Sequence, residues 1–570
     1  MNNGTIKNFQ GVPKSKIART RFTPIGTVKT SFNAGKLVPI AVDEILPNTT
    51  YDLRLKAIVR GSTPFAPVMD NAFMDVYAFF VPNRLVWEHW EDFLAEAAPR
   101  AYEQAPQYST PQITFSGTGP YSSFLQKSFW DYVGVGSASG ATRLENMPAL
   151  SALYPRGYAL IWNEWFRDQN LEDPAHVYVD DTDRAYPFLK SDPIVVAEFG
   201  RALLPVSKFK DYFTSALPKP QKGLPVTIPF AQDAPVSGFI TNNLAGVSAA
   251  NSFIPLWYDD DFLQHSGTHL LGTRGGSVNG GQTVFGPSGA SGSTAHLSLA
   301  LSEATADLSQ ASAVTINALR LAFQTQRFQE RLARSGSRYT ELLRSMFGIY
   351  ASDARLQRPE YLGGRRFPIT QHQVAQTTEN DVSQSIGLGD TGAFVFAADV
   401  TDTLVKRSFS EHGMVFYLAC VRTSQTYSQG VAPKFTRRNR FDYYFPAFAH
   451  IGEQPIYQQE IYAGVGPAEN KIVFGYKEPW VEYKYRENVV TADMRPQAEK
   501  SLAVWNYAND FKFAPTLTPN FTHETTANID RTLQVQSSEV DQFFADFCFD
   551  FKALDLPMPP FNEPGLIDHN

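Results

Sequence analysis

Cysteine is scarce in this sequence: among 570 residues there are only two, Cys420 and Cys548. Each lies in an apolar run of the kind that forms strands, so we expect two buried free thiols and neither a disulfide framework nor a cysteine-based metal site. The sequence also lacks a hydrophobic run near the roughly 20 residues that a membrane span needs. Its N-terminal residues contain no apolar segment typical of a secretory signal. We therefore expect a soluble protein, without membrane insertion, made in a reducing cytoplasm.

Acidic side chains are missing from residues 1–42, although the whole chain has a formal net charge of −7. Residues 1–21 have low hydrophobicity and no periodic pattern, which predicts an extended basic arm ahead of an acidic body. A solvated tail and an arm that binds DNA phosphates both fit this composition. The candidate DNA-binding residues are the five cations of the arm: Lys7, Lys14, Lys16, Arg19 and Arg21.

Motifs for metal binding are few and incomplete. His265 and His269 are four residues apart, but the glutamate of an HExxH motif is missing and the intervening glycine opposes a helix, so we discount zinc. Three carboxylates cluster at residues 180–183. A calcium site usually has more oxygen ligands and a glycine turn, so this cluster is only a weak hint of one.

Abundant aromatic residues, glycine and proline characterise the rest of the chain, with 13% Phe, Trp and Tyr, 38 Gly and 38 Pro. This mixture suits β-strands joined by many turns. In residues 51–59 apolar and polar side chains alternate, which predicts a strand with one buried face. Residues 73–81 are almost continuously apolar, which predicts a strand covered on both faces. The chain is therefore expected to be mainly β, an antiparallel β-sandwich with long loops.

Two arginine-rich segments are candidates for contacts with other molecules. Residues 435–445 interleave arginines with aromatic side chains, a mixture that can stack single-stranded bases but also fits an edge strand packed against a partner, which we favour. Residues 315–334 are expected to form a long helix with a stripe of arginines. Such a stripe fits a solvated face, an ion-pair ladder or a subunit interface. The arginines of the stripe are Arg320, Arg327, Arg331 and Arg334.

Two other classes of protein remain open on the residues alone. A β-sandwich glycoside hydrolase would need two carboxylates flanking a cleft, and the acidic clusters at 180–183 and 259–261 are the candidates. A carbohydrate-binding protein would use exposed aromatic side chains such as Trp257 and Tyr258.

Long strings in one order, spread over most of the chain, carry a family resemblance: FNAGKLVPIAVDEILP, TPFAPVMDNAFMDVYAFFVPNRLVWEHWEDF, WNEWFRDQNL, LRLAFQTQRFQERLAR, RFDYYFPAFAHIGEQPIY and PGLIDH. The sequence resembles the major capsid proteins of the gokushovirus branch of the Microviridae, which are small icosahedral phages with single-stranded DNA. The length and common order of the strings make chance a poor explanation.

The resemblance implies a viral jelly-roll β-sandwich with long loop and α-helical insertions. The jelly-roll domain would cover residues 22–570 and follow the basic arm at 1–21. The implied insertions and the C-terminal arm are a helix and loop region at 84–218, a Gly/Ser-rich surface protrusion at 219–310 that meets the host, a helical segment at 314–350 and an arm at 540–570.

The function that the resemblance implies is structural rather than enzymatic, with no cofactor. It is self-assembly into a T=1 icosahedral shell of sixty identical chains that encloses a circular single-stranded DNA genome. The implied partners are the chain itself, the packaged DNA, an internal scaffolding protein, a small basic DNA-binding protein, a DNA pilot protein and a host surface receptor. The implied location is the virion, assembled in the cytoplasm of a bacterial host.

Overall fold

The computed structural model describes residues 19–95, 108–115, 117, 119–187, 192–226, 316–335, 338–375 and 391–561, together with five short strands between residues 236 and 306. The chain divides into two compact units: Met1–Gly223 with Gln329–Asn570, and Leu224–Phe328. The short strands belong to the second unit and are β9 (Val236–Ser237), β10 (Phe253–Leu256), β11 (His269–Thr273), β12 (Phe285–Pro287) and β13 (Thr305–Ala306).

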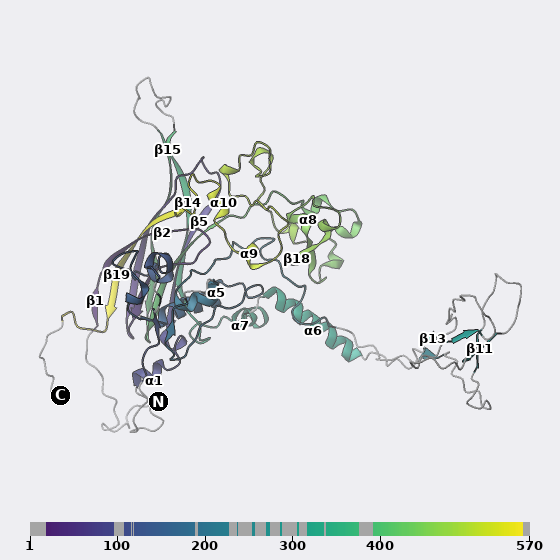
Figure 1. Ribbon diagram of the computed structural model, residues 1–570, viewed down its shortest axis with the longest axis horizontal. Helices are drawn as coiled ribbons and strands as arrows, with labels where there is room; N and C mark the ends of the chain where they lie inside the picture. The colour runs from purple at the N-terminus through teal and green to yellow at the C-terminus, as the bar shows by residue number, and fades with distance from the viewer. Residues whose placement is uncertain are drawn as a thin grey trace, which may run out of the picture. The chain divides into compact units, whose positions relative to one another are not determined.

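Nine strands of the larger unit form one hydrogen-bonded set in which all neighbours are antiparallel (Figure 1). Their order is β1-β19-β4-β15-β14-β5-β16-β3, and β2 also pairs with β19. The strands are β1 (Thr20–Phe22), β2 (Ile25–Phe32), β3 (Val38–Ile45), β4 (Thr50–Gly61), β5 (Ala72–Pro82), β14 (Glu360–Ala375), β15 (Thr391–Ser408), β16 (Gly413–Thr423) and β19 (Phe543–Leu556).

The long strand β14 joins two layers of this set. Its first part, residues 360–369, pairs with β5, and its second part, residues 370–375, pairs with β15. Inward side chains from strands of both layers then meet in one apolar core. Because alternate residues of a strand share one face, this common core shows that the two layers face each other as a β-sandwich.

The buried faces follow the sequence patterns. In β4 the alternate residues from Tyr51 to Val59 are buried, whereas β5 is buried along most of its length. In β19, Phe547 and Phe549 enter the same core and Cys548 between them does not. The prediction of a mainly β, antiparallel sandwich is thus confirmed, while its jelly-roll connectivity stays a prediction.

A helical layer covers the outer face of β5 and β16. Phe79 and Phe416 point away from the sandwich core and pack in a second core with the side chains of α4 (Leu153–Ile161). A Cβ on Gly157 would lie 2.7 Å from the ring of Phe416, so α4 approaches β16 as closely as only glycine allows. The Tyr158 hydroxyl donates a hydrogen bond of 2.6 Å to the Leu37 carbonyl, which fixes α4 beside β3.

The other elements between β5 and β14 in the larger unit are short. They are η3 (Asn83–Leu85), α1 (Trp90–Ala95), β6 (Gln112–Thr114), α2 (Tyr121–Phe124), α3 (Phe129–Tyr132), η4 (Leu144–Asn146), β7 (Leu150–Ser151), η5 (Trp162–Phe166), β8 (Arg184–Ala185), α5 (Pro193–Val196), η6 (Ala197–Phe199), α7 (Tyr339–Leu342) and η8 (Leu343–Phe347). The long helix α6 (Ile316–Ser335) precedes α7. In the described part of the chain, no helix is both long and apolar enough to cross a membrane.

Residues 424–542 connect β16 to β19 and build a third, smaller core around Phe213, Tyr427 and Phe474. Their elements are η9 (Pro433–Phe435), η10 (Arg440–Asp442), η11 (Pro446–Phe448), β17 (Gln454–Tyr457), α8 (Gln458–Ile461), η12 (Glu469–Lys471), β18 (Val473–Lys477), η13 (Val481–Tyr483), η14 (Ala492–Met494), η15 (Ala503–Trp505), α9 (Pro519–Thr522) and α10 (Ala527–Asp530).

The predicted C-terminal arm lies partly in the sandwich. Of the arm proposed at 540–570, Phe543–Leu556 forms the inner strand β19, and residues 562–570 lie outside the described residues.

Both cysteines are free thiols on strands. Cys420 is buried, and burial raises the pKa of its thiol to about 12. Cys548 is only half-buried, so the prediction of two buried thiols was wrong for this residue.

Candidate interaction surface

The arginine stripe of α6 is partly used inside the chain. Arg331 donates a hydrogen bond of 2.6 Å to the Ser345 carbonyl, and Arg334 forms an ion pair with the buried carboxylate of Glu453. Arg320 and Arg327 are exposed on the same helix. Arg331 and Arg334 therefore stabilise the subunit itself. A role of the stripe as a subunit interface stays a prediction.

The basic arm is described only at its end. Lys7, Lys14 and Lys16 lie outside the described residues, and Arg19 donates a hydrogen bond to the Thr50 hydroxyl. Arg21 makes two hydrogen bonds, of 2.7 and 2.9 Å, to the carboxylate of Asp555 on β19. These bonds lower the pKa of Asp555, so the charge of Arg21 is already matched by an acid. DNA contact by the arm stays a proposal.

The acidic cluster at 180–183 holds loops together. Asp181 accepts hydrogen bonds from Trp87 and His89, and Arg184 donates a hydrogen bond of 2.6 Å to Asp180. Within the described ranges, no three acidic, histidine or cysteine side chains converge as a metal site would require. The second cluster at 259–261, Trp257, Tyr258 and His265 lie outside the described residues, and no side-chain placement is described for His269 on β11.

The segment at 435–445 is where the structure departs most from expectation. The predicted edge strand is wrong, because the chain forms the three short 3-10 helices η9, η10 and η11 instead. Pro433 and Pro446 occupy first-turn positions, where their fixed φ suits a helix start. Asp442 accepts hydrogen bonds from the backbone N–H groups of Arg438 and Asn439, at 2.7 and 2.8 Å, and so caps the N-terminus of η10. The Asn-x-x-Asp spacing and the two prolines were the signals for this arrangement.

The segment that contains these helices and the neighbouring η13 expose a group of aromatic side chains to solvent. We call this group the aromatic surface and define it by its exposed members: Phe435, Phe441, Tyr443, Tyr444, Phe445 and Tyr483. Phe448 lies beneath it and contacts the rings of Phe441 and Phe445, with centroids 6.0 and 6.5 Å apart. Trp480 supports Tyr444 at 5.5 Å. Edge-to-face contacts of this kind order the exposed rings.

Arg437 ties the two sequence segments of the aromatic surface together. Its guanidinium lies 4.5 Å from the ring centre of Tyr483 and 5.4 Å from that of Tyr443. The same group forms an ion pair of 2.6 Å with Glu482. Because η13 follows the β17–β18 hairpin, sequence reasoning had no local signal that Tyr483 or Trp480 would join residues 433–448.

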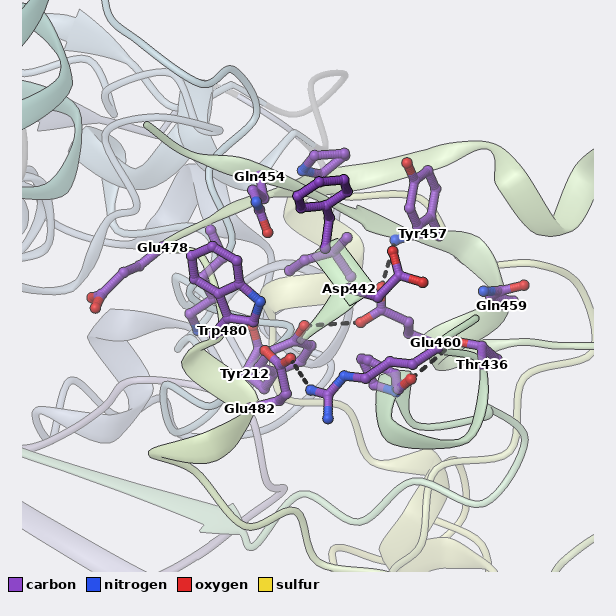
Figure 2. Close-up of a pocket in the computed structure, with 16 residues that line it drawn as sticks. Tyr212, Thr436, Asp442, Gln454, Tyr457, Gln459, Glu460, Glu478, Trp480 and Glu482 are labelled. Atoms are coloured by element: carbon purple, nitrogen blue, oxygen red, sulfur yellow. Dashed lines mark hydrogen bonds and ion pairs between the residues drawn. The ribbon is translucent and has the colours of Figure 1, made fainter. Parts of the chain in front are cut away.

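A pocket of about 430 Å³ opens beside the aromatic surface (Figure 2). Tyr212, Glu460, Trp480 and Glu482 are among the residues that line it. The Tyr212 hydroxyl donates a hydrogen bond of 2.8 Å to Glu460, and the Tyr457 backbone N–H donates another of 2.9 Å. Burial nevertheless raises the pKa of Glu460 to about 7.

The carboxylates of this pocket are committed to the fold. Glu482 pairs with Arg437, and Glu478 pairs with Lys484. Asp442 and Glu460 accept the hydrogen bonds described above. The pocket therefore does not offer the free carboxylate that glycoside hydrolysis needs beside an acid.

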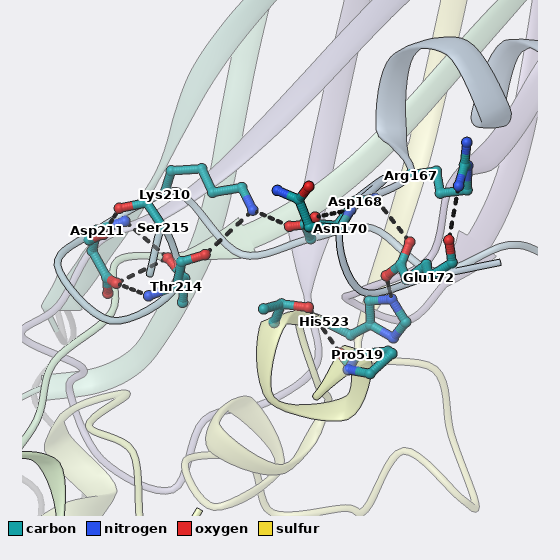
Figure 3. Close-up of polar contacts among 12 residues, drawn as sticks. Arg167, Asp168, Asn170, Glu172, Lys210, Asp211, Thr214, Ser215, Pro519 and His523 are labelled. Carbon is teal, nitrogen blue, oxygen red and sulfur yellow. Dashed lines mark hydrogen bonds and ion pairs between the residues drawn. The ribbon is translucent and has the colours of Figure 1, made fainter. Parts of the chain in front are cut away.

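A second pocket, of about 620 Å³, borders a polar network in the same unit (Figure 3). Glu172 accepts a hydrogen bond of 3.0 Å from the Asp168 N–H and forms an ion pair with His523, which follows α9. Lys210 reaches Asp168 at 2.6 Å. The network holds three separate loops to one another, so its charged groups are structural.

Comparison with known proteins gives concordant matches over nearly the whole chain. Residues 10–566 match the family described as capsid protein (F protein). The chain is 34% identical over 607 residues to capsid protein VP1 of Chlamydia phage 1, covering 98% of each sequence. It is 34% identical over 567 residues to capsid protein VP1 of Bdellovibrio phage phiMH2K, again covering 98% of each. It is 32% identical over 572 residues to capsid protein VP1 of Spiroplasma virus 4, covering 98% of this chain and 96% of that protein.

Proposed function

The chain belongs to the capsid protein (F protein) family, and on that premise we propose that it builds a T=1 icosahedral shell of sixty copies around a circular single-stranded DNA phage genome. It is a structural, non-enzymatic protein of the virion that assembles with itself into a shell. The observation that carries this conclusion is the match to three phage capsid proteins over at least 96% of both sequences.

The alternatives of a glycoside hydrolase and a carbohydrate-binding protein find no support. The relatives are capsid proteins, and the described carboxylates of the candidate pocket and of the cluster at 180–183 are bound by neighbouring side chains or backbone groups.

The finer features of the assembly belong to the same proposal. They are jelly-roll connectivity, a host-facing protrusion formed by residues 219–310, and assembly in the cytoplasm of the bacterial host. The proposed partners are an internal scaffolding protein, a small basic DNA-binding protein, a DNA pilot protein and a host surface receptor. The family resemblance supports each of them.

Electron microscopy of the purified chain, alone and with the other gene products of its phage, tests the proposal. We expect uniform closed shells whose symmetry averaging gives sixty subunits. Monodisperse single chains under every condition would contradict it.

Neutralising the basic arm should reduce the DNA content of the particles. The variant replaces Lys7, Lys14, Lys16 and Arg19 with glutamine, and it leaves Arg21 in place because that side chain is paired with Asp555. If all four contact phosphates, the slope of log affinity for single-stranded DNA against log salt concentration should become shallower by about three. This change of slope corresponds to roughly a fiftyfold difference in affinity between 50 and 200 mM salt. Many copies on one inner wall amplify this effect through multivalency. The measurement is the ratio of DNA absorbance to protein absorbance in purified particles, followed by a salt titration of oligonucleotide binding.

A control variant removes the same charge from exposed lysines outside the arm. It carries glutamine at Lys406, Lys471, Lys500 and Lys512. Equal DNA content in the arm variant and wild-type particles would exclude the arm as a DNA-binding element, and equal loss in both variants would reduce its role to net charge.

A further inference from the structure

The aromatic surface is as large as the largest exposed patches of ordinary proteins or larger. Its six side chains are between 45% and 74% exposed. Together they expose roughly 500–800 Å² of aromatic area, at 150–250 Å² per aromatic side chain. The largest apolar patch of a typical monomer is about 300–600 Å², and a stable protein interface covers about 800 Å² on each partner. The patch thus has nearly the area of one side of an interface.

The surface is also held in place before any partner arrives. Prolines lie in the first turns of η9 and η11, and Asp442 caps the N-terminus of η10. The guanidinium of Arg437 lies over the ring of Tyr483 and so connects this segment to η13. A rigid aromatic patch loses little conformational entropy on binding, which favours its use as a contact.

The charges around the patch favour a protein partner over nucleic acid. Among the described residues, the side-chain cations of Lys434, Arg438 and Arg440 form no ion pair within 4.0 Å, and the side chains of Lys434 and Arg440 lie over the adjoining rings of Phe435 and Phe441. Carboxylates also lie beside the surface, because Asp442, Glu478 and Glu482 line the adjoining pocket. Single-stranded DNA binds to grooves of one positive sign, whereas mixed charge around aromatic and arginine side chains is typical of protein interfaces.

We propose that the aromatic surface is a contact between subunits, occupied by a second copy of this chain that presents carboxylates opposite Lys434, Arg438 and Arg440. This inference rests on the proposed function, because a shell of identical chains must bury such surfaces against copies of itself. The 57 acidic residues of the chain supply the carboxylates that would face these cations. Tyrosine, phenylalanine and arginine are also the side chains that carry much of the affinity of interfaces.

The test compares shell formation by two variants that each lose three exposed phenylalanines. The surface variant carries serine at Phe435, Phe441 and Phe445, and the control carries serine at Phe65, Phe513 and Phe561. We expect the surface variant to keep the thermal unfolding midpoint of the wild-type subunit but to need at least a hundredfold higher protein concentration to form shells, as followed by sedimentation and electron microscopy. The control is expected to assemble as the wild type does.

Shells formed by the surface variant at the wild-type concentration would overturn the inference, and so would an equal loss of assembly in the control. If the surface variant does not fold, R438E with R440E replaces it, because both side chains are exposed and the rings remain; assembly is again expected to need a higher protein concentration. A surface variant that assembles normally but no longer binds a single-stranded oligonucleotide would assign the surface to DNA instead. Failure of the wild-type chain to form shells with or without its phage partners would contradict the proposed function, not this surface.

Discussion

Replacing Asp75 with asparagine should lower the free energy of unfolding by about 3 kcal/mol. Asp75 lies on β5 and is 2% exposed. It accepts hydrogen bonds from Arg366 on the neighbouring strand β14, at 2.6 and 3.2 Å, and from Arg422 on β16, which lies on the other side of β5. One carboxylate thus joins three adjacent strands of the sheet.

The cost arises because the substitution leaves two guanidinium groups beside each other without an anion. Their carbon atoms lie 4.3 and 4.4 Å from the ring centre of Phe209, so one aromatic ring covers both. Removing one partner of a buried charge pair typically costs 3–5 kcal/mol, and we expect the lower end because Arg366 reaches water. Asparagine keeps the shape of aspartate, so the loss reports charge and not a cavity.

Denaturant unfolding followed by tryptophan fluorescence, at one fixed protein concentration, measures this loss. The matched control is Asp550→Asn on β19, whose ion pair with Lys56 at 2.8 Å lies at the surface, where solvent screens it, so this substitution should change the stability far less than Asp75→Asn. Equal destabilisation by the two substitutions would show that the charge of Asp75 is not what the strands depend on.

Asp75 also illustrates what the sequence could not predict. The alternating and continuous apolar patterns gave β4 and β5 correctly, because these patterns reflect burial of faces that each strand carries locally. The partners of Asp75 lie about 300 residues further along the chain, where no local pattern points to them. The pairing of β19 with β4 spans a still larger separation, from Phe543 opposite Gly61 to Asp555 opposite Thr50, and could not be inferred from either strand.

The segment at 433–448 shows the opposite limit. Its alternation of arginine and aromatic residues resembles the pattern of a strand, but the rings are exposed and do not pack in a core. The prolines and Asp442 favour short helical turns instead. The composition also predicts a contact surface, and this stays a proposal. Its extent depended on Trp480 and Tyr483, which only the folded chain brings beside it.

Replacing Glu460 with glutamine should remove a pH dependence of stability that the wild-type protein shows between about pH 4.5 and 7. Burial raises the pKa of Glu460 from 4.5 to about 7, so the folded chain holds a proton there that the unfolded chain releases. The favourable contribution of this proton is fully present below pH 4.5 and is lost as the pH rises through 7. At 1.36 kcal/mol for each pKa unit, the wild-type protein should lose about 3 kcal/mol across this window relative to the variant.

The Glu460→Gln substitution should also lower the free energy of unfolding by an amount that does not depend on pH. Glutamine has one acceptor oxygen, whereas Glu460 uses both of its oxygens for Tyr212 and the Tyr457 N–H, so the variant should lose about 1 kcal/mol at every pH. The free energies of unfolding at pH 4.5, 6 and 8 separate the two effects. Glu478→Gln on the same pocket wall, where the carboxylate is exposed and paired with Lys484, should stay parallel to the wild type within about 0.5 kcal/mol. Parallel profiles for Glu460→Gln and the wild type would mean that Glu460 is ionised throughout, and that Tyr212 and the Tyr457 N–H compensate its burial fully.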